Sequence, residues 1–130
     1  MTTLVVTGRA GAKRMAVARI GLGVAGLIAP RVLGRAWIGT EGASARVAQI
    51  TRAFAARDMA LGLGALIAVQ RDAPVRGWIE AGLVCDLADT ASSMGGAVGR
   101  IKKALLAGAA LVAVAGGILS LRGLEPTDPS

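Results

Sequence analysis

The stretch Ala45–Gln70, ARVAQITRAFAARDMALGLGALIAVQ, decides the fold, because it sets a charged pair at the centre of a largely apolar helix whose first half also carries Arg46 and Arg52. Arg57 and Asp58 lie at its middle, and residues 59–69 are purely apolar. Ser44 directly precedes the stretch, as a helix N-cap would. Inside a bilayer a charge is costly unless it is paired or hydrated, so the dipeptide is a candidate functional site.

The composition favours a membrane protein over a soluble helical bundle. Charged residues make up 18% of the 130-residue chain, below the roughly 25% of an average soluble domain, and hydrophobic residues make up 54%. Nineteen glycines would weaken helices in water, whereas small residues let helices approach closely in a bilayer. We therefore expect an all-α fold of four antiparallel transmembrane helices in a small bundle, as a multi-pass integral protein of the cell membrane.

The helix boundaries follow from the apolar runs. Besides Ala45–Gln70, helices are expected from Met15 to Leu33, from Trp78 to about Gly99, and from Ala104 to Leu121, a run of 18 uncharged residues. This divides the chain into a basic N-terminal lead (1–14), a four-helix membrane domain (15–121) and a frayed C-terminal tail (122–130).

Turns and small residues indicate how the helices pack. A turn through residues 34–43 places Trp37 at a membrane interface, and the short loop 71–77 makes the second and third helices antiparallel neighbours. Residues four apart share a helix face, so two small-residue faces are expected to carry helix contacts. They consist of Gly21, Ala25 and Ala29, and of Ala56, Ala60 and Gly64.

The net charge of +7 does not indicate nucleic acid. The basic residues mostly bracket the apolar runs, as helix-end anchors do, and no aromatic residues interleave with them as a base-stacking surface requires. The bilayer is therefore the expected partner, together with a second copy or a larger membrane protein. Six basic residues fall on each side of a four-span protein, so the charge distribution does not decide its orientation.

The second and third helices bring four charged residues to one depth. Arg57 lies about 16 residues before the centre of the loop and Asp89 about 16 after it, and antiparallel partners equally far from a turn lie level. Asp58 is level with them, and Asp86 shares a helix face with Asp89. We expect an ion pair between Arg57 and Asp86 or Asp89.

Two interpretations of this polar cluster remain open. It is either a structural clasp that fixes helix register, or the lining of a hydrated cavity that serves a ligand head group or a proton. Three further charged residues are secondary candidates: Arg52, Glu80 and Arg76. Glu80 is expected to pair with Arg76 near the surface. The chain has no histidine and one cysteine, Cys85, so no metal and no cofactor is expected.

The middle of the chain resembles a family of small four-helix membrane proteins common in actinobacteria, grouped under a domain of unknown function. The resemblance rests on an Arg-Asp dipeptide ahead of Leu-Gly-x-Gly (residues 57–64), a Trp after the loop (Trp78) and an Asp-x-x-Asp in the third helix (residues 86–89). It implies four helices, membrane location and no assigned activity. The favoured role is a non-enzymatic membrane subunit or interaction protein, and the alternative is a small membrane enzyme or carrier for a hydrophobic substrate.

Overall fold

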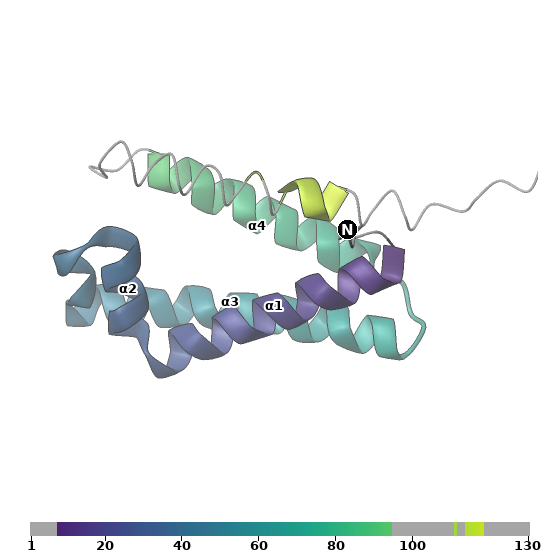
Figure 1. Ribbon diagram of the computed structural model, residues 1–130, viewed down its shortest axis with the longest axis horizontal. Helices are drawn as coiled ribbons and strands as arrows, with labels where there is room; N and C mark the ends of the chain where they lie inside the picture. Colours follow the sequence, from purple (N-terminus) through teal and green to yellow (C-terminus); the bar gives the residue numbers. More distant parts are fainter. Residues whose placement is uncertain (1–7, 95–110, 112–113, 119–130) are drawn as a thin grey trace, which may run out of the picture.

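The computed structural model describes residues 8–94, 111 and 114–118, and all regular elements within this part of the chain are helical (Figure 1). The elements are α1 (Gly8–Ile28), α2 (Pro30–Ile38), the short 3₁₀ helix η1 (Thr40–Ala43), α3 (Ala45–Gln70) and α4 (Arg76–Met94). The all-α prediction is confirmed for these residues. Of the expected helix 104–121, residues 111 and 114–118 are helical, and the remainder lies outside the described residues.

A sharp elbow replaces the single helix expected from Met15 to Leu33. The helix begins earlier, at Gly8, and ends at Ile28, and α2 then leaves at an angle of 105°. Pro30 is the cause, since proline has no N–H to donate and its ring clashes with the carbonyl four residues back. The residue before it, Ala29, is pushed out of the helical region to φ −125° and ψ 54°. The expected turn through residues 34–43 is therefore wrong, because α2 and η1 occupy most of it.

Helix α3 has the expected bounds and is capped at both ends. The Ser44 hydroxyl accepts a hydrogen bond from the Val47 N–H at 3.3 Å, as predicted for an N-cap. At the other end the Arg9 guanidinium of α1 donates to the Val69 carbonyl at 2.9 Å and pairs with Asp72 at 3.1 Å. A cation suits a helix C-terminus, where carbonyls lack partners and the helix dipole is negative. Arg9 thus binds within the protein and does not belong to a separate N-terminal lead.

Helices α1 and α3 pack antiparallel along small residues (Figure 1). The buried core between them includes Ala12 and Ala16 of α1 and Ala65 and Ala68 of α3. A Cβ atom on Gly62 would lie 2.8 Å from the Ala16 carbonyl oxygen, so the backbones are too close for any larger residue. The small-residue faces expected from the sequence do not form this contact, since Gly21, Ala25, Ala56 and Ala60 are exposed. Both helices carry small residues on several faces, and spacing alone does not select one.

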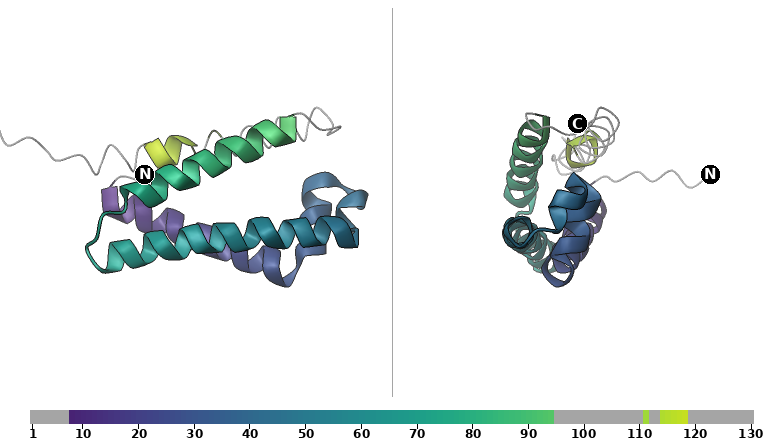
Figure 2. Two further views of the ribbon diagram at one scale, coloured as in Figure 1. Left: turned by 180° about the vertical axis from the view of Figure 1, so that it is seen from behind. Right: turned by 90° about the vertical axis from the view of Figure 1, so that its left-hand side faces the viewer.

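Helix α4 joins the pair at one end and diverges from it toward its C-terminus (Figure 2). Val75 and Ile79 extend the buried core near the loop, and the Trp78 ring lies over Gly64 of α3. Further along, Leu83 packs against Gly117. Among the described residues, apolar packing between α3 and α4 is sparse compared with that between α1 and α3, and polar side chains make contacts between the middle of α4 and these two helices.

Among the described residues, α3 is long and apolar enough to cross a membrane. The bent pair α1 and α2 meets the same criteria only if it counts as one broken span. Helix α4 does not meet them, because four charged side chains lie within its 19 residues: Arg76, Glu80, Asp86 and Asp89.

A candidate functional site between three helices

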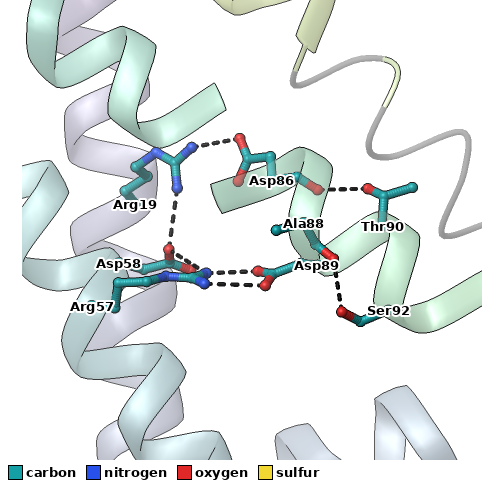
Figure 3. A network of polar contacts seen from close by, with 8 residues as sticks. All are labelled: Arg19, Arg57, Asp58, Asp86, Ala88, Asp89, Thr90 and Ser92. Atoms are coloured by element: carbon teal, nitrogen blue, oxygen red, sulfur yellow. Dashed lines mark hydrogen bonds and ion pairs between the residues drawn. The ribbon is translucent and has the colours of Figure 1, made fainter. Parts of the chain in front are cut away.

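Five charged side chains form one chain of alternating sign across α1, α3 and α4 (Figure 3). The order of contacts is Asp86, Arg19, Asp58, Arg57 and Asp89. Both ends of this polar network lie on α4, one helical turn apart. With all groups ionised, three carboxylates and two guanidinium groups leave one negative charge in excess.

The predicted ion pair of Arg57 is confirmed, and its partner is Asp89. Two parallel contacts join the groups, from Nη2 to Oδ2 at 2.6 Å and from Nη1 to Oδ1 at 3.1 Å. This bidentate geometry is the strongest that arginine and a carboxylate adopt, and it also fixes their relative orientation. The depth estimated from the loop centre was therefore accurate, since a shift of one turn would have brought Asp86 to this position.

The surroundings of Arg57 hold its guanidinium in place. Nη2 also contacts Asp58 Oδ1 at 3.2 Å, and the guanidinium carbon lies 5.2 Å from the centre of the Phe54 ring. That distance is within the range of a cation–π contact. The Nε atom is buried and has no hydrogen-bond acceptor among the described residues. The polar network therefore satisfies the two terminal nitrogens of Arg57 but not the third.

Arg19 of α1 is the central member of the network. Its Nη1 lies 3.1 Å from Asp58 Oδ1 and its Nη2 lies 2.5 Å from Asp86 Oδ2, so one guanidinium bridges α3 and α4. The side chains are largely buried, with 15% of Arg19, 14% of Asp58 and 19% of Asp86 exposed. Gly82 of α4 makes room for the bridge, because a Cβ there would lie 2.8 Å from Arg19 Nη2.

Arg19 is a member of the network that was not predicted from the sequence. A signal was nevertheless present, since three acids at one depth with a single arginine leave two buried negative charges unbalanced. Arg19 is the one charged residue of the first apolar run, which lies between Arg14 and Arg31. Charge balance would have pointed to it. The distance from a loop could not predict the depth of Arg19, because α1 is joined to α3 by an elbow and not by a simple turn.

The secondary candidates lie outside the network. Arg76 Nε lies 2.8 Å from Glu80 Oε1, as predicted, with both side chains about half exposed. Arg52 is exposed and lines a cavity near the elbow between α1 and α2. The hydroxyls of Thr90 and Ser92 donate to backbone carbonyls four residues back in α4, so they serve their own helix (Figure 3).

Chemically, the network can fix the register of three helices or hold a proton among three carboxylates. Within residues 8–94, 111 and 114–118, no group of three metal-ligating side chains comes together. The role of the network has to be argued from its geometry and surroundings, because no family model matches the chain and neither a curated protein nor a solved structure matches it.

Proposed function

We propose that the chain is a multi-pass integral membrane protein with a non-enzymatic role, in which the polar network is a structural clasp. Its spans would be α1, α3, α4 and the helix expected at 104–121. The protein would associate with itself or with a larger membrane protein through exposed small-residue faces. The chain would thereby join the small four-helix membrane proteins that it resembles, whose shared Arg-Asp and Asp-x-x-Asp residues here meet in one network.

The observation that carries the proposal is an inverted distribution of side chains. The most buried apolar residues are mainly alanines, such as Ala12 and Ala16 at 1% exposure. Large apolar side chains point outward along every long helix, among them Val17, Leu22, Ile50, Phe54, Leu63, Ile67, Val84 and Leu87. A soluble protein buries its large apolar side chains. A bilayer solvates them, and close packing of small residues then holds the helices together.

The charged side chains are also distributed differently from those of a soluble protein. Arg19, Asp58 and Asp86 lie inward at mid-helix, whereas the basic residues near the helix ends, such as Arg35 and Arg71, are exposed. Ionisable groups in a membrane helix face the bundle interior and pair with one another. The cost of burying each guanidinium is offset by two carboxylate contacts.

Exposed small residues offer faces for a partner helix. Gly21 of α1 has open space where a Cβ would lie, and Ala25 on the same side is exposed. Ala56 and Ala60 form a second exposed pair on α3. Neither pair is used in the contact between α1 and α3. In lipid, such faces let another helix approach closely enough for backbone contact, which supports an interaction role.

Membrane fractionation tests the proposal. The full chain should stay in the pellet after the membranes are washed with alkaline carbonate, which strips peripheral proteins. It should be released by detergent and not by high salt. Recovery of a monodisperse, detergent-free protein from the soluble fraction would contradict both the membrane location and the outward placement of the large apolar side chains.

One observation favours a second candidate, a small membrane enzyme or carrier that uses the carboxylates of α4. The network carries one carboxylate more than its two arginines balance. An uncompensated negative charge in a region of low dielectric favours uptake of a proton. Asp86, at one end of the network, would then exchange that proton with a substrate.

The change Asp86→Asn separates the two candidates by the sign of its effect on stability. Asparagine keeps the shape and hydrogen-bonding capacity of aspartate but loses its charge. For a clasp, weakening the contact with Arg19 should lower the melting temperature in detergent. For a working site, removing the excess charge should leave the melting temperature unchanged or raise it, because such sites hold unfavourable charge for function. A stabilised Asp86→Asn protein would therefore move the second candidate to first place.

A further inference from the structure

A cavity of about 360 Å³ lies at the elbow, away from the polar network. Its lining comes from the end of α1, the start of α2 and the first turns of α3: Ile28, Ala29, Pro30, Arg31, Val32, Ala45, Ala48 and Arg52. The volume falls in the range of small-ligand pockets, about 300–1,000 Å³.

The charged groups that line the cavity are both cations. Arg31 and Arg52 make no ion pair within the described residues. The surrounding segment, residues 29–52, holds four arginines (Arg31, Arg35, Arg46 and Arg52) and one acid, Glu41. The electrostatics of the cavity therefore suit an anion.

The elbow also sets the depth of the cavity if α1 crosses the bilayer. A helix that leaves α1 at 105° lies nearly in the membrane plane, at the level of the headgroups. Arg52 lies two turns into α3, about 10 Å below its first residue, from where a long side chain reaches back to the interface. Both arginines can therefore meet a phosphate at headgroup depth.

The lining of the cavity also includes two apolar side chains that are largely exposed. Ile28 is 79% exposed and Val32 is 69% exposed, and both belong to the lining. A ligand that fits this surface has an anionic group beside Arg31 and Arg52 and a hydrocarbon part over Ile28 and Val32. A free phosphate ester has the first feature and lacks the second, whereas an anionic phospholipid has both.

We infer that the elbow cavity is a binding site for the headgroup of an anionic phospholipid, with the phosphate between Arg31 and Arg52 and an acyl chain over Ile28 and Val32. This inference rests on the proposed membrane location. It adds a ligand class and a site that the packing role does not require. The site would fix the elbow at the interface and select the composition of the surrounding lipid.

Lipid titration of the full chain in detergent tests the site, with native mass spectrometry as the readout. Phosphatidylglycerol should bind about tenfold more tightly than phosphatidylcholine of the same acyl chains, because two basic side chains meet the anionic group. Replacing both Arg31 and Arg52 by glutamine should abolish this preference. The matched control replaces Arg35 and Arg46 by glutamine, which removes two exposed arginines of the same segment outside the lining and should retain the preference.

Three outcomes would overturn the inference. The first is equal loss in both double variants, which would indicate general surface charge. The second is no lipid preference in the unmodified protein. The third is equally tight binding of glycerol 3-phosphate, which would make the ligand a soluble phosphate ester. Carbonate extraction of the same variants keeps the two proposals apart, since a variant can remain in the membrane pellet after its lipid preference is lost.

Discussion

Replacing Arg19 by methionine is expected to lower the melting temperature of the detergent-solubilised protein by roughly 10–20 °C, from a loss of about 3–5 kcal/mol. Methionine preserves the unbranched apolar stem and removes the guanidinium. The change leaves Asp86 without its arginine and Asp58 with Arg57 alone, both in largely buried positions. Removing one partner of a buried ion pair is costly because the remaining charge stays desolvated.

Arg76→Met is the matched control, since it breaks the exposed contact with Glu80. Exposed pairs contribute about 1 kcal/mol or less, so this variant should melt close to the unmodified protein. Adding Asp86→Asn to Arg19→Met should recover part of the loss, because it removes one of the stranded charges. Equal melting temperatures for Arg19→Met and Arg76→Met would show that the network contributes nothing as a clasp.

Placing leucine at Gly62 is expected to destabilise the fold by about 3 kcal/mol or more, and to convert the purified protein into aggregate. A Cβ at this position would lie 2.8 Å from the Ala16 carbonyl oxygen and 3.0 Å from the Ile20 backbone nitrogen. Backbone atoms of a helix cannot turn aside as a side chain can. The larger side chain therefore has to separate α1 from α3, which removes the packing that holds most of the core.

Gly77→Leu is the matched control, with the same change on α4 where nothing lies within 4 Å of the added Cβ. This variant should remain monodisperse and melt at or above the temperature of the unmodified protein, because leucine is the better helix former. Size-exclusion profiles and melting curves of the two variants provide the comparison. Similar behaviour of both would mean that the close contact of α1 with α3 is not required for folding.

Features that depend on local pattern or on a short connection could be predicted from the sequence. The bounds of α3 and its Ser44 cap follow from an apolar run with a capping residue before it. The Arg57–Asp89 pair follows because a short loop fixes the depth of two antiparallel helices. The Arg76–Glu80 pair follows from the spacing of residues on one helix. Each depends on few residues and on no distant contact.

Features that depend on packing could not be predicted in this way. Pro30 was placed near the end of a helix, but its ring and the conformation it imposes on Ala29 end the helix at Ile28 and turn the chain. Small residues lie on several faces of α1 and α3, so periodicity could not select the face that is buried. Arg19 lies across an elbow whose geometry sets its depth, and only charge balance could have identified it.

The order of charges along the chain has a consequence for how the protein is made. Helix α1 contributes one positive charge to the network, Arg19, and α3, which follows it in the chain, contributes Arg57 and Asp58, whose charges cancel. Helix α4 brings the two carboxylates that complete the network. Without α4, Arg19 and Arg57 have one carboxylate in the network between them, that of Asp58. On the proposed membrane location, a chain truncated before Asp86 would leave Arg19 and Arg57 to share Asp58, and it should insert less stably than the full chain.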